Sequence, residues 1–261
     1  MRPLPNVMVA PNGARLTKAD HPALPISIEE VVACARECAA AGADGLHAHV
    51  RDAEQKHSLD AGLYRELLRE MDVALPGFYA QITTEAVGIY TPAEQKSLIA
   101  DLRPQAVSIA LREITNGQTE QETQKFFCDC AEQGTEVQHI LYDATDIEHL
   151  ARSVEHGIIP SQNLAALLVI GRYEAETEVT PAKVIERATL VTRLMPQVDW
   201  ALCAFGQPET DCLLQAHALG GKIRIGFENN RLNSDGRVAA SNAERVREYL
   251  REASSAVTLN I

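Results

Sequence analysis

The stretch that decides the fold is residues 27–50, SIEEVVACARECAAAGADGLHAHV. Its first part is typical of a helix, with Ser27 in the N-cap position, Glu30 three residues later and Gly42 just past the helix end. From Gly45 the chain becomes a short apolar run, which indicates a buried strand. A helix that leads straight into a buried strand is a unit of α/β proteins.

The same alternation recurs along the whole chain. Strands are expected at 6–11, 45–50, 77–83, 106–111, 136–142, 164–171, 198–205 and 222–227. Helices are expected at 27–42, 60–73, 91–102, 119–133, 143–157, from about 180, at 208–219 and at 241–253. Such alternation implies parallel strands with right-handed crossovers. Eight units in 261 residues predict an α/β protein with a single (β/α)8 TIM barrel domain over residues 1–261.

An open, doubly wound sheet is the alternative fold, but no G-x-G-x-x-G motif follows the first expected strand. The barrel has a functional consequence, because active sites of such barrels form at the carboxyl ends of the strands. Polar residues at those ends are therefore the candidates for function.

The overall charge narrows the class of partner. The chain has 24 Lys and Arg against 36 Asp and Glu, a formal net charge of −12. This argues against nucleic acid and anionic membranes as partners, although a few local cations can still hold a small anionic substrate. No apolar run approaches the ~18 residues of a membrane helix, and the start does not resemble a signal peptide. We therefore expect a cytoplasmic protein.

Two histidines, His47 and His49, lie one residue apart at the end of the second expected strand. Residues at i and i+2 share one face of a strand, so both imidazoles should point the same way. Two imidazoles aimed into a barrel mouth can ligate one zinc ion. The alternative is a pair of core histidines that hydrogen-bond to their neighbours. Their shared face at a barrel strand end favours the metal.

A third ligand is expected from the eighth strand, where RIGFENN places Glu228 at the end of the apolar run. Alternate strands of a barrel fill the same interior layer, and the second and eighth strands are both even-numbered. His47, His49 and Glu228 can therefore converge on one metal ion. Zinc suits two imidazoles and a carboxylate, although iron or manganese also tolerates them. Taken alone, Glu228 also fits a solvated loop acid or a helix-dipole partner.

Arg224 has the same strand parity as Glu228 and should also point inward. A buried guanidinium needs a partner, which leaves two readings open. Arg224 either forms a structural ion pair or reaches the site, where it orients an acid or binds a substrate carboxylate. Other polar residues at strand ends, each of which also fits a cap, a turn or a solvated charge, are Thr83, Thr84, Glu85, Ser108, Arg112, Glu113, Tyr142, Asp143, Arg172 and Gln207.

With these residues in place, the chain resembles the β-keto acid cleavage enzyme family over nearly its whole length. Three segments carry the resemblance: NGARLTKADHPALPISIEE (12–30), AGADGLHAHVRD (41–52) and GGKIRIGFENN (220–230). The resemblance implies a TIM barrel, usually a homo-oligomer, with a catalytic divalent metal that is normally zinc. Its matching ligands are His47, His49 and Glu228, and the active-site arginine of the family matches Arg224.

The resemblance also implies a reaction. The family cleaves a β-keto acid with an acetyl-CoA-type thioester, and the products are acetoacetate and a new acyl-CoA. The metal polarises the keto carbonyl, a base generates a carbon nucleophile that attacks the thioester, and a retro-Claisen step breaks the carbon–carbon bond. The small-molecule partners would be a β-keto acid and an acyl-CoA. Thr83 or Thr84 stands where the family has a serine, and we expect both, with Ser108, to contact the substrate.

Two departures from the family pattern bear on the reaction. Arg15 replaces a family glutamate, and Asn229 replaces the aspartate after the metal-binding glutamate. Asn229 cannot act as a general base, because its amide does not titrate near neutral pH. If Arg15 faces the substrate, it repels the amino group of 3-keto-5-aminohexanoate and favours an anionic or neutral substrate. We place Arg224 and Asn229 in the catalytic group and Arg15 among the substrate-binding residues.

Three functions remain open on the sequence. The first is a zinc-dependent β-keto acid cleavage enzyme of altered specificity, with the base role moved to another residue or taken by metal-bound water. The second is a metal-dependent carbon–carbon lyase or hydrolase that uses no CoA. The third is a catalytically silent barrel that still binds a metal or ligand, which the loss of two family carboxylates would also fit.

Overall fold

Eight parallel strands form the centre of the molecule, as the computed structural model shows for residues 2–172 and 178–259. These strands are β1 (Val7–Val9), β2 (Gly45–Ala48), β5 (Tyr79–Thr83), β6 (Ala106–Ala110), β7 (Glu136–Leu141), β8 (Ala165–Ile170), β9 (Asp199–Ala204) and β10 (Lys222–Ile225). They close into a barrel in the order β1-β10-β9-β8-β7-β6-β5-β2. The predicted barrel fold is confirmed. Residues 1, 173–177 and 260–261 of the expected domain lie outside the described part.

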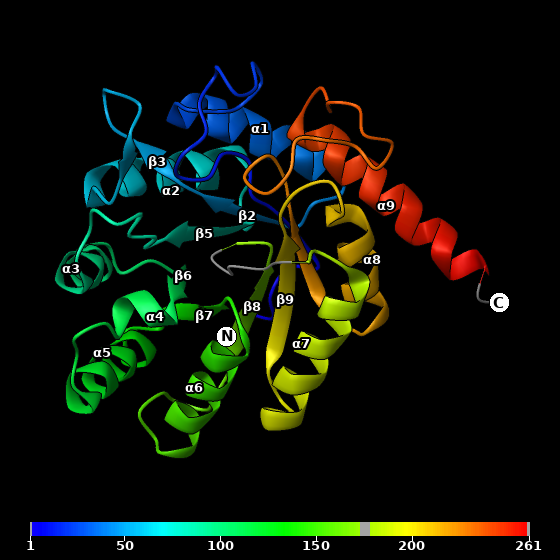
Figure 1. Cartoon of the computed structure of the whole chain (residues 1–261). Coiled ribbons are helices and arrows are strands. Elements are labelled where there is room, and N and C mark those ends of the chain that lie inside the picture. Colours follow the sequence, from blue (N-terminus) through cyan, green and yellow to red (C-terminus); the bar gives the residue numbers. More distant parts are fainter. Residues whose placement is uncertain (1, 173–177, 260–261) are drawn as a thin grey trace.

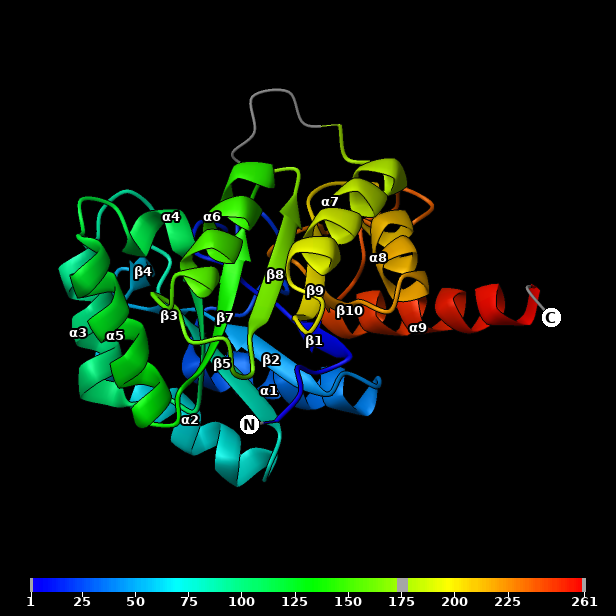
Figure 2. The same cartoon turned by 90° about the horizontal axis from the view of Figure 1, so that it is seen from below.

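Helices surround the barrel (Figures 1 and 2). They are α1 (Ile28–Ala40), α2 (Ala61–Ala74), α3 (Pro92–Leu102), α5 (Glu120–Glu132), α6 (Ala144–Glu155), α7 (Pro181–Leu194), α8 (Glu209–Ala218) and α9 (Asn242–Leu259). Figure 2 shows α9 extending beyond the barrel on one side. No helix within residues 2–172 and 178–259 combines the length and apolar character that a membrane span requires.

Local sequence signals set the helix starts. The Ser27 hydroxyl accepts from the backbone N–H of Glu30, whose side chain accepts from the Ser27 N–H in return. The same reciprocal capping opens α3 at Thr91 and α5 at Thr119. Each box satisfies backbone donors that a helix start leaves open. Asp143 caps α6 through the backbone N–H of Asp146, so its role as a helix cap is confirmed.

Three short elements were not predicted: β3 (Val50–Arg51), β4 (His57–Ser58) and the helix α4 (Leu111–Ile114). β3 and β4 pair antiparallel, so the strand expected over residues 45–50 is wrong at its end. Its last residues leave the barrel and join this hairpin. The strand expected at 222–227 is also too long, since the chain turns at Gly226, whose φ is 143°. An added Cβ there would meet the Ala10 carbonyl oxygen at 2.5 Å.

Apolar side chains pack on both faces of the strands. The larger cluster fills the space between barrel and helices, and a smaller one lies inside the barrel. Alternation along each strand sends successive side chains to these two layers. From the middle of the strands toward their carboxyl ends the interior layer becomes polar, because His47, Gln81, Gln138 and Arg224 occupy inward positions and are all at most 4% exposed. The fold therefore buries a polar group of side chains where barrel active sites form.

Candidate metal centre and active site

The three predicted metal ligands converge at the carboxyl end of the barrel. His47 Nε2 lies 3.3 Å from His49 Nε2, and Glu228 Oε2 lies 3.7 Å and 3.5 Å from these two nitrogens. All three side chains are buried. They form the group of potential metal ligands found among the described residues, with ligand atoms within 4.8 Å of one another.

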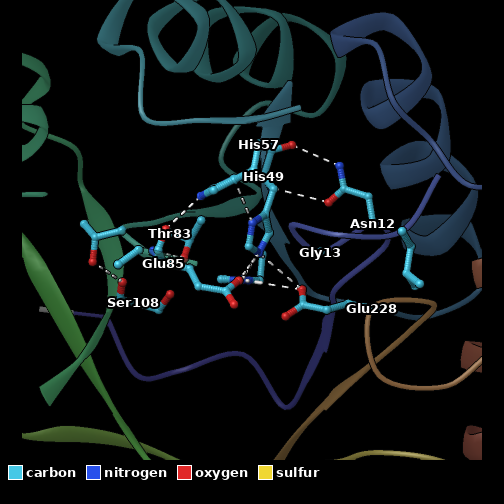
Figure 3. A network of polar contacts seen from close by, with 12 residues as sticks. Asn12, Gly13, His49, His57, Thr83, Glu85, Ser108 and Glu228 are labelled. Atoms are coloured by element: carbon cyan, nitrogen blue, oxygen red, sulfur yellow. Dashed lines mark hydrogen bonds and ion pairs between the residues drawn. The ribbon is translucent and has the colours of Figure 1, made fainter. Parts of the chain in front are cut away.

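His49 reaches this position just after β2 ends. The side chain of Asn12 donates to the His49 carbonyl at 2.9 Å and accepts from the His49 backbone N–H at 3.3 Å (Figure 3). Asn12 thus takes the place of a neighbouring strand at a residue that no longer pairs within the barrel. The i, i+2 spacing brings the imidazoles of His47 and His49 together, as expected, although the strand itself stops between them.

Glu228 lies in the turn after β10 and not in the strand itself. Its position at the site is therefore set by this turn, whereas the sequence pattern predicted that the strand would set it. Its backbone N–H donates to the Ala10 carbonyl at 3.1 Å. Asn242 braces the turn, because its side chain accepts from the Phe227 N–H at 2.8 Å and donates to the Pro11 carbonyl at 3.2 Å. The side chain of Glu228 also packs so closely on Gly13 that an added Cβ there would lie 2.7 Å from its Cγ.

The charge states of these groups favour a bound cation. Burial, with a further contribution from Arg224, holds the pKa of His47 well below its usual value. Burial opposes ionisation of Glu228, but Arg224 and the two imidazoles outweigh it, so the pKa of this carboxyl lies well below its usual value. Glu228 Oε2 has no hydrogen-bond partner among the described residues. A neutral imidazole and an unpartnered carboxylate oxygen face one point, and this nitrogen and oxygen donor set suits zinc or a similar divalent ion.

Arg224 adds open donors to the same site. Its Nη2 donates to Glu228 Oε1 at 3.2 Å and contacts Cys203 Sγ at 3.5 Å. Its Nε and Nη1 have no partner among the described residues, although the side chain is only 5% exposed. A buried guanidinium with open nitrogens is suited to bind a carboxylate. The Arg224 side chain therefore fits both interpretations, because one nitrogen forms an ion pair with Glu228 and two others are available to bind a ligand.

Two cavities meet at these residues. A chamber of about 20 Å³ lies over the imidazoles, and a cavity of about 550 Å³ opens at the barrel mouth. Arg172, Phe205 and Glu228 line both. The remaining residues of the chamber wall are His47, His49, Thr83, Glu85, Ile140, Tyr142, Val169 and Arg224.

The expected substrate-binding residues separate into two groups. Thr83 lines the chamber, and Arg15 lines the mouth. Thr84 and Ser108 line neither cavity, and both residues are fully buried. The Thr84 hydroxyl donates to the Ser108 carbonyl at 3.3 Å. The Ser108 hydroxyl has no partner among the described residues. The roles expected for these four residues stay predictions.

Asn229, which replaces the family aspartate, lines the mouth next to Glu228. Its Nδ2 donates to the Arg224 carbonyl at 3.1 Å and to Glu209 Oε1 at 3.4 Å, and its Oδ1 has no partner among the described residues. Burial raises the pKa of Glu209 to about 7, while Arg245 opposes this rise. Asn229 therefore offers an amide oxygen to the site and directs its amide nitrogen elsewhere.

Three further residues lie at the site. In the sequence, Glu85 and Arg172 stood only among the polar strand-end residues that also fit a cap, a turn or a solvated charge, and His57 was not singled out. Glu85 Oε2 lies 3.9 Å from His49 Nε2, and its Oε1 accepts from Arg172 Nη2 at 2.8 Å. Figure 3 shows Glu85 and Glu228 approaching His49 from different sides. Glu85 and Arg172 follow the ends of β5 and β8, the position that marked both of them in the sequence. The third, His57, belongs to the unpredicted hairpin, and burial with the neighbouring His49 lowers its pKa to about 3.

Comparison with known proteins bears on this site. The family model described as "beta-keto acid cleavage enzyme" matches residues 6–257. The chain belongs to the β-keto acid cleavage enzyme family. The resemblance noted in the sequence is confirmed.

Two relatives have assigned activities. The chain is 24% identical over 246 residues to the 3-keto-5-aminohexanoate cleavage enzyme of Fusobacterium nucleatum subsp. nucleatum, which covers 92% of this chain and 87% of the relative. It is 23% identical over 246 residues to the 3-oxoadipate:acetyl-CoA acetyltransferase of Cupriavidus necator, with coverage of 92% and 85%. Their names indicate enzymes that act on β-keto acids, one of them with acetyl-CoA.

Solved structures share the fold. A ternary complex of ObcA with a C4-CoA adduct and oxalate aligns with a TM-score of 0.66 and 14% identity, over 90% of this chain. The chain spans 65% of the length of that ObcA chain. A type I 3-dehydroquinate dehydratase from Clostridium difficile aligns with a TM-score of 0.62 and 11% identity, over 99% of this chain and 93% of that one. At these identities the likeness establishes the barrel alone.

Proposed function

We propose that this protein is a zinc-dependent β-keto acid cleavage enzyme that uses an acetyl-CoA-type thioester and forms acetoacetate and a new acyl-CoA. The observation that carries the proposal is the buried group of two imidazoles and a carboxylate, beside a guanidinium with open donors. Family membership and the names of the two relatives support the same reaction class.

His47, His49 and Glu228 would hold the metal. A bound divalent cation would supply a Lewis acid that polarises a keto carbonyl of the substrate. The three side chains are at most 8% exposed, so water is largely excluded from the ligand atoms. This low-dielectric setting strengthens the attraction between the ligands and a cation.

Arg224 would bind and orient the substrate carboxylate through its open Nε and Nη1. The Thr83 hydroxyl lies in the same chamber, but it accepts from the Glu85 backbone N–H at 3.0 Å, so it offers its proton to a substrate oxygen. Ile140 and Val169 form the apolar part of the wall and keep water from the reacting atoms. Thr84 and Ser108 would act from beneath the chamber by supporting this wall.

The mouth favours an anionic or neutral keto acid. Arg15 and Arg172 both line it, and Arg172 stacks over the Phe205 ring at 5.0 Å. Two guanidinium groups there disfavour a substrate with an ammonium group, such as 3-keto-5-aminohexanoate. We therefore propose a specificity that differs from that of the Fusobacterium relative.

Proton transfer requires a group other than Asn229. Asn229 cannot titrate near neutral pH, and we assign its role to the amide oxygen that it offers to the substrate. Glu85 is the chamber carboxylate that is not among the three ligands. We assign proton transfer to Glu85, which its ion pair with Arg172 holds beside the chamber. Glu85→Gln should lower kcat by ~10²–10⁴-fold, the usual contribution of general acid–base catalysis, while zinc remains bound.

The test combines metal analysis with turnover. Purified protein should contain about one zinc ion per chain, and the zinc-loaded protein should convert acetyl-CoA and an anionic or neutral β-keto acid into acetoacetate and a new acyl-CoA. Both products are followed by mass spectrometry. His47→Ala should lose metal and turnover. His139→Ala is the matched control, because His139 is equally buried in β7 but packs against the Phe127 ring, away from the site.

Two results would contradict the proposal. A wild-type protein that stays metal-free after reconstitution with zinc, and is unchanged by His47→Ala, would point to a silent barrel. A zinc-loaded protein that consumes no β-keto acid with acetyl-CoA would remove the assigned reaction.

A second function, a metal-dependent lyase or hydrolase without CoA, is favoured by one observation. Residue 229 is an asparagine where the resemblance to the family implies an aspartate, and its Nδ2 donates to the Arg224 carbonyl and to Glu209. Cleavage of a β-keto acid that proceeds equally with and without acetyl-CoA would select this function. Asn229→Asp should then create the dependence on acetyl-CoA.

We also propose a cytoplasmic homo-oligomer. The homo-oligomer rests on the resemblance to the family. The names of the two relatives and the net charge of −12 support a protein that acts on small molecules rather than on nucleic acid or membranes. Light scattering of the purified chain tests the assembly, and a mass equal to one 28.5 kDa chain would contradict it.

A further inference from the structure

Two chains of buried hydrogen bonds end on the imidazoles of His47 and His49, and the function proposed above does not use them. In a neutral imidazole one ring nitrogen donates and the other accepts. A hydrogen bond at one nitrogen therefore decides how the other nitrogen acts. A backbone carbonyl oxygen can only accept, so the direction of every bond in a chain that ends on one is determined.

The first chain begins at the Ala166 carbonyl in β8. Gln138 Nε2 donates to this oxygen at 3.4 Å, which leaves Gln138 Oε1 to accept from Gln81 Nε2 at 3.1 Å. Gln81 Oε1 then lies 2.9 Å from His47 Nδ1. An amide oxygen cannot donate, so His47 donates from Nδ1 and carries its lone pair on Nε2, which faces Glu228.

The second chain begins at the Glu85 carbonyl (Figure 3). His57 Nε2 donates to this oxygen at 2.8 Å. The other nitrogen of the neutral His57 ring is then an acceptor, and it lies 3.4 Å from His49 Nδ1. His49 therefore also donates from Nδ1, and its Nε2 lone pair faces Glu228.

We propose that Gln81, Gln138 and His57 are positioning residues that hold His47 and His49 as Nδ1–H tautomers, so that the site is arranged for a metal ion before one binds. This inference rests on the metal site proposed above. All three positioning residues are buried, so water does not compete for their hydrogen bonds.

The arrangement has an electrostatic consequence. With both rings in the Nδ1–H form, the 3.3 Å contact between the two Nε2 atoms is not a hydrogen bond. These two nitrogens and the unpartnered Glu228 oxygen then lie within 3.3–3.7 Å of one another without a proton between them. Three electron-rich atoms at such distances repel each other in a dry site, and a cation at their centre removes the repulsion. The hydrogen bonds at the two Nδ1 atoms hold the protons there, so neither imidazole can relieve this repulsion by moving its proton to Nε2.

Zinc affinity tests the inference. Gln81→Leu and His57→Leu remove the acceptors for the two Nδ1–H groups and should lower zinc affinity by about 10- to 100-fold, the usual effect of losing such a partner. His57→Gln keeps a donor for the Glu85 carbonyl and an acceptor for His49, so it should restore affinity close to the wild-type value. His139→Leu is the control for losing a buried imidazole elsewhere. Competition with a chromophoric chelator measures each affinity.

A second measurement identifies the tautomers directly, and a general loss of stability would not change its result. Long-range ¹H–¹⁵N correlation spectra of the metal-free full chain should show His47 and His49 as Nδ1–H tautomers and His57 as the Nε2–H tautomer. An Nε2–H tautomer at His47 or His49 would overturn the inference, and so would leucine variants that bind zinc as tightly as the wild type. A wild-type chain with the expected tautomers that binds no zinc would support the positioning and contradict the proposed function, so the two failures are distinguishable.

Discussion

Strand β10 carries two cations two residues apart, and their ion pairs differ in kind. At its amino end, Lys222 donates to both oxygens of Asp199 at 2.6 Å, and the Leu4 N–H donates to the same carboxylate at 2.8 Å. Near its carboxyl end, Arg224 pairs with Glu228 at 3.2 Å. The first pair is partly exposed, at 18% and 33%, whereas the second is buried, at 5% and 4%.

The two pairs differ in whether their hydrogen-bonding groups all have partners, and this property distinguishes a structural ion pair from a binding site. Both oxygens of Asp199 accept hydrogen bonds, so the Lys222 pair needs no further partner. The Arg224 pair leaves two guanidinium nitrogens and one carboxylate oxygen without partners among the described residues. Native proteins rarely leave buried charged groups incomplete, and the exceptions need an explanation. A metal ion and a substrate carboxylate would complete this pair.

Removing the buried cation should have the largest effect. Arg224→Met leaves the Glu228 carboxylate buried without a cation, and breaking a buried pair in this way costs about 3–5 kcal/mol. We expect this loss in urea unfolding of the metal-free protein, and a smaller loss when zinc is bound, because the cation then balances Glu228. A loss below about 1 kcal/mol, the value for exposed pairs, would contradict the energetic difference between the buried pair and the partly exposed pair.

The buried pair should also respond to acid. A carboxyl whose folded pKa is depressed contributes stability that is present above its unfolded pKa, near 4.3, and is lost as the pH falls through the folded pKa. The pKa of Glu228 is depressed because Arg224 and the two imidazoles outweigh the opposing effect of burial. Below about pH 4 the metal-free wild type should therefore lose about 1.4 kcal/mol more per pH unit than Glu228→Gln. Urea unfolding at several acid pH values measures this difference, and parallel curves would refute it.

A smaller change tests the packing behind Glu228. Gly13 has a φ of 60°, and a Cβ added there would lie 2.7 Å from Glu228 Cγ. Gly117 has a φ of 67° with no atom within 4 Å of an added Cβ, so it is a control for backbone strain. Gly13→Ala and Gly117→Ala should each lose about 1–2 kcal/mol of unfolding free energy. Only Gly13→Ala should weaken zinc binding, and equal zinc affinities would show that Gly13 does not set the position of Glu228.

The smallest effect is expected at the other end of the strand. Lys222→Met removes a partly exposed pair, so the unfolding free energy should change by about 0–1 kcal/mol and zinc affinity should stay at the wild-type value. Urea unfolding and chelator competition measure the two quantities. A stability loss as large as that of Arg224→Met would mean that exposure does not separate the two pairs.

The barrel was predictable because its signals are local. Apolar runs alternate with capped helical segments such as the one that starts at Ser27, and each signal depends on a few neighbouring residues. His47 and His49 were predictable for the same reason, since an i, i+2 spacing needs only a strand that extends near them. The hairpin of β3 and β4 was missed because it consists of only two residue pairs. Its turn has a single sequence signal, Asp52, whose side chain accepts from the Glu54 and Lys56 backbone N–H groups.

The surroundings of the site were less predictable. Gln81 and Gln138 contact each other across β6, and Glu85 meets Arg172 across 87 residues, so these pairs exist only once the barrel closes. Thr84 stands at a strand end like Thr83, yet it lines neither cavity. Adjacent residues at a strand end point in opposite directions, and only the structure shows which of them faces the chamber.

The sequence by itself determined the order of the strands and helices, the family and the three expected metal ligands, because periodicity and motif spacing are properties of short segments. Three features are visible only in the tertiary structure. A turn at Gly226 places Glu228 at the site, and the ion pair of Arg224 and Glu228 leaves polar atoms without hydrogen-bond partners among the described residues. The hydrogen-bond chains through Gln81 and His57 end on backbone carbonyls. These features depend on contacts between segments far apart in the chain. Such contacts are set by barrel closure and register rather than by local preference.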